Sequence, residues 1–275
     1  MSKGFLVFAQ NTDTVDYVRQ AYALSLSIHN SQEEIKNISL VTNSSVSDKY
    51  KSVFDQIIPI PWFDAKGNNR YATEHRWKIF HATPYDETIV LDADMLVLED
   101  LSDWWEFCKD YNIKFCSKVK NYKQETITSD PFHRKSFIAN KLSNPYFALH
   151  YFKKTEQAKT FYKVLEYVIN NWELCCGQFA PKEYQKCVSM DLATAITIDI
   201  LDMQDIVDLA NPFEFVHMKT MLQGWTLPPT SWQDITVCYY ANKKLFVNNI
   251  QQDKIFHYVD KNFLSEKLIR DLENV

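Results

Sequence analysis

The chain has 275 residues, of which 46% are hydrophobic and 24% are charged, and its formal net charge is −5. This length suffices for one large domain, and a mildly acidic chain is not built as a whole to bind nucleic acid. No apolar stretch is long enough to span a bilayer, and the N-terminal run lacks a signal peptide's features. We therefore expect a cytoplasmic protein without a transmembrane segment.

The first hundred residues alternate between short apolar runs and helical patterns. We expect strands at 5–9, 38–42, 56–60 and 88–98, separated by helices at 15–29, 47–54 and 71–82. This order predicts a parallel sheet with helices on its faces. Ligands of such sheets bind beyond the carboxyl ends of the strands, where the polar residues Asn11 and Thr12 follow the first strand.

The strand expected at 88–98 contains two carboxylates, Asp92 and Asp94, within an apolar run. Side chains two positions apart on a strand point to the same side, so both acids would face one side. Buried carboxylates are costly unless a cation meets them. The pattern therefore predicts a site for a hard divalent cation, Mn²⁺ or Mg²⁺, which would bind a diphosphate.

The chain contains only four glycines, so neither a GxGxxG motif nor a P-loop can be formed. Rossmann dehydrogenases and P-loop kinases need glycine where the backbone approaches phosphate, so both classes are disfavoured. A bound nucleotide would need another means of holding its phosphates, and a metal ion is the obvious one.

The second half is less regular. We expect helices at 100–111, 155–172, 190–201 and 264–272, and strands at 115–119, 147–152, 235–240, 244–247 and 255–258. The segment from 114 to 154 is rich in lysine and aromatic residues. Such a run is usually a solvated face, but it could also form a groove for an anionic acceptor, including DNA.

Six segments occur in the order found in one enzyme family. They are FAQNT (8–12), RWK (76–78), LDADMLVL (91–98), SNPYF (143–147), SMDLA (189–193) and FHYVDK (256–261). On these segments the chain resembles the GT-A fold glycosyltransferases, and among them the retaining group that includes glycogenin and the bacterial lipooligosaccharide galactosyltransferases. It lacks that group's glycine after Asn144 and its Gly-x-x-Lys-Pro-Trp ending.

The resemblance implies an α/β, GT-A (Rossmann-like) fold, with a mostly parallel sheet, helices on both faces and an irregular acceptor-side half. It implies a single domain over 1–275, with a nucleotide-binding half at 1–100 and an acceptor half at 101–275 that ends in a metal and phosphate segment. The implied activity is metal-dependent transfer of a hexose from a nucleotide sugar, a UDP-sugar, to an acceptor hydroxyl with retention.

The resemblance also implies roles for individual residues. The metal ligands would be Asp92, Asp94 and His257. The donor-binding residues would be Ala9, Asn11, Thr12, Arg76, Lys78, Asp92 and Lys261. The catalytic residues would be Asp191 and Asn144.

Several alternatives remain open from the sequence. His217 rivals His257 as the third metal ligand, and Asp191 could simply favour the start of a helix. The acceptor could be a glycan, a protein, a lipid head group or a modified DNA base, contacted from 118–145 and 223–232. Other functions are a nucleotidyltransferase, or a catalytically inactive GT-A binding module. The sequence does not indicate an oligomeric state.

Overall fold

The computed structural model describes residues 1–63, 73–127, 131–207, 212–218, 232 and 236–275. A central six-stranded sheet has the order β3–β2–β1–β4–β8–β6. Its strands are β3 (Gln56–Ile58), β2 (Ile38–Val41), β1 (Lys3–Phe8), β4 (Glu87–Asp92), β8 (Tyr146–Lys153) and β6 (Ile113–Cys116). The first four run parallel and β8 runs antiparallel to both neighbours, so the sheet is mostly parallel, as predicted.

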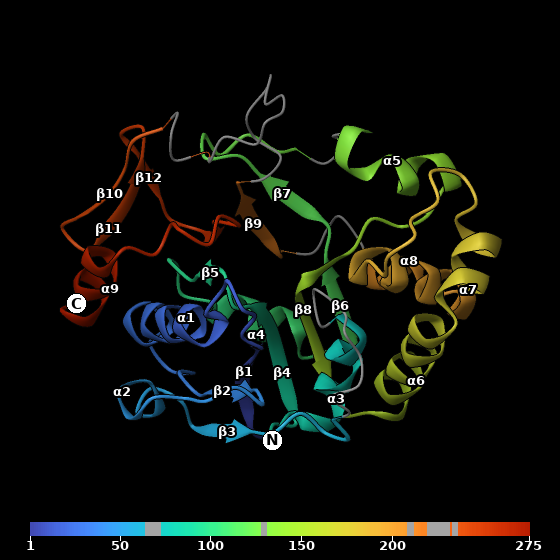
Figure 1. Cartoon of the computed structure of the whole chain (residues 1–275), viewed down its shortest axis with the longest axis horizontal. Coiled ribbons are helices and arrows are strands. Elements are labelled where there is room, and N and C mark those ends of the chain that lie inside the picture. Colours follow the sequence, from blue (N-terminus) through green and yellow to red (C-terminus); the bar gives the residue numbers. More distant parts are fainter. Residues whose placement is uncertain (64–72, 128–130, 208–211, 219–231, 233–235) are drawn as a thin grey trace.

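The two faces of this sheet carry separate hydrophobic cores, because side chains alternate along each strand. In β1, Phe5 and Val7 belong to one core, whereas Leu6 and Phe8 belong to the other. The first core contains α1 (Tyr17–Ser31), α4 (Ser102–Cys108) and α9 (Glu266–Glu273). The second contains α3 (Ile79–Ala82), α6 (Glu156–Asn170), α7 (Trp172–Phe179) and α8 (Met190–Leu201). Figure 1 shows α1 and α9 on one side of the sheet and α6 to α8 on the other.

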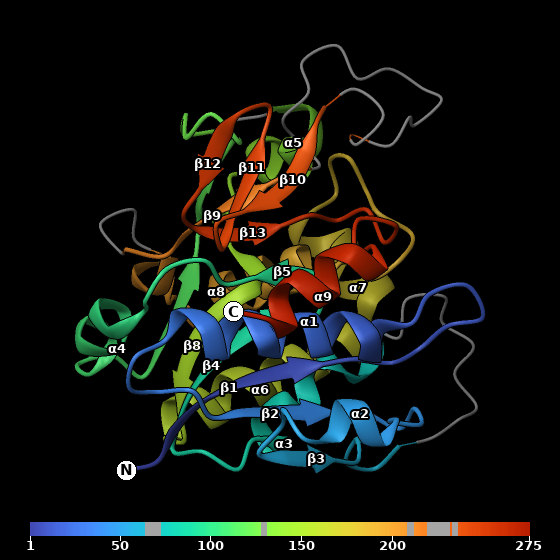
Figure 2. The same cartoon turned by 90° about the vertical axis from the view of Figure 1, so that its left-hand side faces the viewer.

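Two smaller sheets lie at the carboxyl-end side of the central strands (Figure 2). One has the order β5 (Met95–Leu96), β13 (Ile255–His257), β9 (Glu214–His217) and β7 (Lys118–Lys120). The other is an antiparallel sheet of β10 (Cys238–Ala241), β11 (Lys244–Val247) and β12 (Ile250–Gln252). The remaining elements are α2 (Asp48–Lys51), α5 (Pro131–Asn140) and the 3₁₀ helices η1 (Thr73–Lys78) and η2 (Gln204–Val207).

The strand expected at 88–98 is wrong as a single element. β4 pairs with β1 as far as Asp92, and the chain then leaves the central sheet. β5 pairs instead with β13, where Met95 lies opposite His257. Asp92 therefore ends a strand and Asp94 lies in the turn that follows, because the two segments belong to different sheets.

Two further expectations need correction. The strand expected at 115–119 divides into β6 and β7, which also belong to different sheets. The helix expected at 71–82 is 3₁₀ over η1 and α-helical only over α3, and residues 71 and 72 lie outside the described residues. The sequence pattern did not predict α5, α7, β9, β12 or η2. Among the described residues, no helix is long and apolar enough to cross a membrane.

Candidate active site

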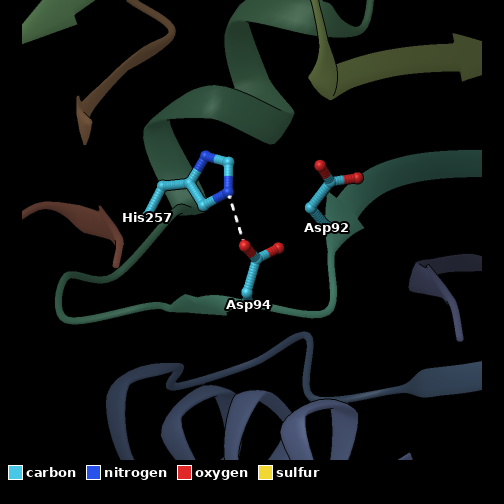
Figure 3. Close-up of side chains that lie close together, drawn as sticks. All are labelled: Asp92, Asp94 and His257. Atoms are coloured by element: carbon cyan, nitrogen blue, oxygen red, sulfur yellow. Dashed lines mark hydrogen bonds and ion pairs between the residues drawn. The ribbon is translucent and has the colours of Figure 1, made fainter. Parts of the chain in front are cut away.

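Three potential metal ligands converge from separate segments. Asp92 ends β4, Asp94 lies in the turn before β5, and His257 ends β13. One ligand atom from each lies within 4.8 Å of the other two. Figure 3 shows the three side chains around a common space. Two carboxylates and one imidazole form a donor set suited to a divalent cation such as Mn²⁺.

The turn that holds Asp94 is fixed by the C-terminal segment. The Tyr258 N–H donates to the Asp94 carbonyl at 3.2 Å, and His257 Nε2 donates to Asp94 Oδ2 at 3.0 Å. His257 Nδ1 is buried and has no hydrogen-bond partner among the described residues. Strand pairing of β5 with β13 thus places the histidine against the carboxylate across 163 residues of sequence.

Basic side chains neutralise both carboxylates. Arg76 is paired with Asp92, and Lys261 is paired with Asp94. Burial disfavours the charged form of Asp94, but His257 and Lys261 outweigh burial and hold the pKa of Asp94 well below its ordinary value. Burial also opposes the charge of Arg76, and the Asp92 carboxylate outweighs it, so the pKa of Arg76 is raised. Asp94 is therefore ionised at neutral pH.

These side chains line a cavity of about 520 Å³. Its wall includes most of the residues that the resemblance implied for the site. They are Asn11, Thr12, Arg76, Asp92, Asp94, Asp191, His257 and Lys261, and the rival ligand His217 is there as well. The carboxyl ends of β1 and β4 thus open into one cavity, where ligands of parallel sheets bind.

His217 and His257 lie side by side on the parallel strands β9 and β13, with ring centroids 4.8 Å apart. Both rings are nearly buried. Only His257 lies in the group with both carboxylates whose ligand atoms fall within 4.8 Å. The geometry therefore favours His257 over His217 as the third ligand.

Asp191 lies in the first turn of α8, which Ser189 caps by accepting a hydrogen bond from the Leu192 N–H. Its Oδ1 accepts from the Phe147 N–H at 2.7 Å, and its Oδ2 pairs with Arg134 at 3.0 Å. Asn144 does not line the cavity, and its Oδ1 is buried without a hydrogen-bond partner in the described part of the chain.

Two other implied donor residues lie outside the cavity wall. Ala9 is buried in the sheet, where its N–H donates to the Val41 carbonyl at 3.0 Å. Lys78 is buried, and its ammonium donates to the Trp62 carbonyl at 2.8 Å. The two basic residues of the RWK segment therefore point in different directions, Arg76 to Asp92 and Lys78 to Trp62.

The cavity wall also contains residues that the sequence analysis did not select. These include Gln10, Tyr17, Glu74, His75 and Tyr146. Gln10 Oε1, Glu74 Oε2 and Arg76 Nε are buried without a hydrogen-bond partner among the described residues. Unpaired buried polar atoms are costly, so their presence around one cavity is consistent with a polar ligand. Gln10 lies within segment 8–12 and Glu74 lies two positions before segment 76–78, and this proximity was the available signal.

Many charges of the lysine-rich segment are engaged within the protein. Lys120 pairs with Glu214 at 2.8 Å, and Lys135 pairs with Glu183 at 2.7 Å. The Lys153 ammonium donates to the Lys109 carbonyl. The other predicted acceptor region, 223–232, lies outside the described residues except for Trp232.

No family model matches the sequence, and a sequence search of curated proteins finds no match. Solved structures do match the fold. Mouse xyloside xylosyltransferase 1 has a TM-score of 0.55 at 9% identity, over 94% of this chain and 97% of that one. The galactosyltransferase LgtC, solved with donor and acceptor sugar analogues, has a TM-score of 0.50 at 11% identity, over 99% and 96% of the two chains.

A third structure, the glycosyltransferase GlyE of Streptococcus pneumoniae, matches over 74% of this chain with 12% identity and a TM-score of 0.42. This chain spans 44% of that protein's length. The two matches that cover nearly the whole chain confirm the predicted fold class, since they extend over both residues 1–100 and residues 101–275.

Proposed function

Because this chain has the GT-A fold, we propose that it is a metal-dependent glycosyltransferase. It would transfer a hexose from a nucleotide sugar, a UDP-sugar, to the hydroxyl of an acceptor, with retention at the anomeric carbon. The observation that carries the proposal is the convergence of Asp92, Asp94 and His257 on one cavity at the carboxyl edge of the parallel strands.

The three side chains fit a divalent cation. They offer two carboxylate oxygens and one imidazole nitrogen, and one ligand atom from each lies within 4.8 Å of the other two. A bound Mn²⁺ or Mg²⁺ would act as a Lewis acid that offsets the negative charge of the diphosphate leaving group. Arg76 pairs with Asp92 and Lys261 pairs with Asp94, so both basic side chains would lie beside a diphosphate bound at the metal.

Asp191 is proposed to accept a hydrogen bond from a hydroxyl of the donor sugar. Both of its oxygens are held by protein donors, which suits a fixed acceptor better than a nucleophile that must approach carbon. In the proposed reaction, the acceptor oxygen bonds to the anomeric carbon on the side from which the diphosphate leaves. The acceptor's proton passes to a diphosphate oxygen, so no enzyme nucleophile is needed.

The first test is thermal unfolding with UDP, with and without Mn²⁺. A ligand that binds only the folded state stabilises it by about 2.7 kcal/mol at a hundredfold excess over Kd. We expect UDP to raise the Tm of the wild type only when Mn²⁺ is present. Asp94→Asn should abolish this rise, because the substitution removes a metal ligand while it preserves the side-chain volume.

Asp110→Asn is the matched control, since Asp110 is an exposed acid outside the cavity wall. It should respond like the wild type. A rise in Tm with UDP that persists in Asp94→Asn would contradict the metal assignment. If Tm rises with another nucleotide but not with UDP, the donor sugar carries that other nucleotide. Absence of a shift with any nucleotide would reject the proposed enzyme and favour a binding module of the same fold.

A further inference from the structure

Arg134 is a buried cation behind the wall of the cavity. It lies in α5, at a point where the backbone leaves helical geometry with φ −118° and ψ 22°. Its side chain is only 8% exposed. Arginine is almost never buried to this extent unless its charge is paired, so the environment of its guanidinium group needs an explanation.

The guanidinium group is held on several sides. Its Cζ lies 3.6 Å from the centroid of the Tyr146 ring and 4.7 Å from that of Phe137. Its NH1 group donates to the Pro145 carbonyl at 3.2 Å. Its NH2 group lies 3.0 Å from Asp191 Oδ2. A planar guanidinium that stacks on aromatic rings and donates from two nitrogens has little freedom to move.

Asp191 is the carboxylate that this arrangement fixes. The Phe147 N–H binds its Oδ1 and Arg134 binds its Oδ2, so each oxygen has one protein donor. A carboxylate offers about four acceptor positions, and about two therefore remain for a ligand. Asp191 lines the cavity and its side chain is 31% exposed, so a ligand there can reach it.

We propose that Arg134 is a positioning residue, which orients Asp191 toward the sugar of the bound donor and neutralises its charge. This inference rests on the proposed function. Stability alone does not require a buried ion pair at this place, because apolar side chains of similar volume often replace such pairs without loss. Without Arg134, Asp191 would keep one anchor and would add an uncompensated charge to a cavity that already holds Asp92 and Asp94.

The test separates binding of the nucleotide from binding of the sugar. Calorimetry with Mn²⁺ would give the Kd of UDP and of a panel of UDP-hexoses. The UDP-hexose whose affinity exceeds that of UDP by the largest factor would be used in the further measurements. Arg134→Met should leave the Kd of UDP within about twofold, because Arg134 touches Asp191 and not the metal ligands. The same variant should lower both the affinity gained from the sugar and the rate of UDP-sugar hydrolysis by about tenfold or more.

Three further variants make the test specific. Arg134→Lys should recover part of the loss, since it retains the charge without the planar fork. In an Asp191→Asn background, Arg134→Met should have little further effect on sugar binding, because the two residues act through one contact. Lys135→Met is the matched control: the Lys135 side chain is 60% exposed and its ammonium pairs with Glu183, so both affinities should remain at wild-type values.

Each outcome decides the proposal. The positioning role is wrong, and Arg134 is structural, if folded Arg134→Met binds the UDP-hexose more tightly than UDP by the same factor as the wild type does. If Arg134→Met does not fold, the same comparison is made with Arg134→Lys. A wild type that binds UDP but gains nothing from any hexose also overturns the inference, while the nucleotide site stands. A wild type that fails to bind UDP instead rejects the proposed function.

Discussion

His150 is a completely buried histidine on β8, whose neighbours determine its tautomer. Its Nδ1 donates to the Phe147 carbonyl at 2.8 Å, so its Nε2 accepts from the Tyr162 hydroxyl at 2.7 Å. The ring also stacks on Phe115 with centroids 4.7 Å apart. Burial in this apolar site lowers the pKa of His150 from 6.5 to about 3.

This shift makes the stability of the fold depend on pH. Between pH 6.5 and about 3, the unfolded chain binds a proton at His150 that the folded chain does not. The free energy of unfolding therefore falls as pH falls through this window, by up to about 1.4 kcal/mol per pH unit from this group. Above pH 6.5 the group contributes no such dependence.

The check is urea unfolding of the wild type and His150→Phe at several values between pH 8 and pH 4. The variant should lose stability overall, and its free energy of unfolding should fall less steeply below pH 6 than that of the wild type. Tyr162→Phe is the control, because it removes the hydroxyl partner but leaves the buried imidazole. Equal slopes for the wild type and His150→Phe would contradict the assignment.

At the scale of the element, β1 depends on a glycine for a packing reason. A Cβ added to Gly4 would overlap the ring of Tyr85, the residue that precedes β4 by two positions. Tyr85 is 4% exposed, and its hydroxyl is hydrogen-bonded to Ser39 at 2.8 Å. The ring is therefore held at its far end and cannot easily move away from β1.

We expect Gly4→Ala to destabilise the protein by about 1–3 kcal/mol, the usual cost of forcing extra volume into a packed core. Chemical denaturation would measure this. The penalty should shrink in a Tyr85→Ala background, because the overlap is then gone and the two substitutions are coupled.

The matched control for this prediction is Gly177→Ala in α7, where an added Cβ meets nothing within 4 Å. Alanine should stabilise this helix by up to about 1 kcal/mol, since glycine loses more conformational entropy on folding. If Gly4→Ala were as benign as Gly177→Ala, close packing of β1 on Tyr85 would not be the reason for the glycine.

At the scale of the whole molecule, the C-terminal segment closes onto the N-terminal half. β13 lies between β5 and β9 in the four-stranded sheet. Arg19 of α1 donates to the Leu264 carbonyl, and Asn30 of α1 donates to the Leu272 carbonyl, both at 2.8 Å. The halves 1–100 and 101–275 therefore share a sheet and a hydrophobic core.

We predict from this interleaving that the two halves unfold together as a single domain. Hydrogen exchange in increasing denaturant should give β1 and β4 the same opening free energy as β9 and β13, because β4 pairs with β8 and β13 pairs with β5 across the boundary between the halves. The short peripheral helix α2 should open earlier and serves as the internal comparison. Separate opening free energies for the two groups of strands would show that residues 101–275 form an independent unit.

The elements that the sequence predicts best depend on short-range patterns. Strands β1 to β4 and helices α1, α6 and α8 follow from apolar periodicity and local caps, since Thr155 and Ser189 each accept a hydrogen bond at the start of a helix. The acidic pair at the end of β4 is visible for the same reason. The periodicity around α5 and β9 is too weak or too short to predict either element.

The tertiary structure decided which of the selected residues meet. The apolar run at 88–98 suggested one strand, but pairing with β13 divides it and brings His257 to Asp94. Arg76 and Lys78 are equivalent by charge, yet only Arg76 reaches the cavity. The ion pair between Arg134 and Asp191 joins two residues that are 57 positions apart in the sequence.

The sequence by itself thus determined the alternating α/β order, the parallel strands and the position of the acidic pair, because each depends on neighbouring residues. Only the tertiary structure decided which histidine lies beside the two carboxylates, which basic residues pair with them and what anchors Asp191. These contacts depend on strand pairing and packing between distant segments, for which a single sequence contains no local pattern.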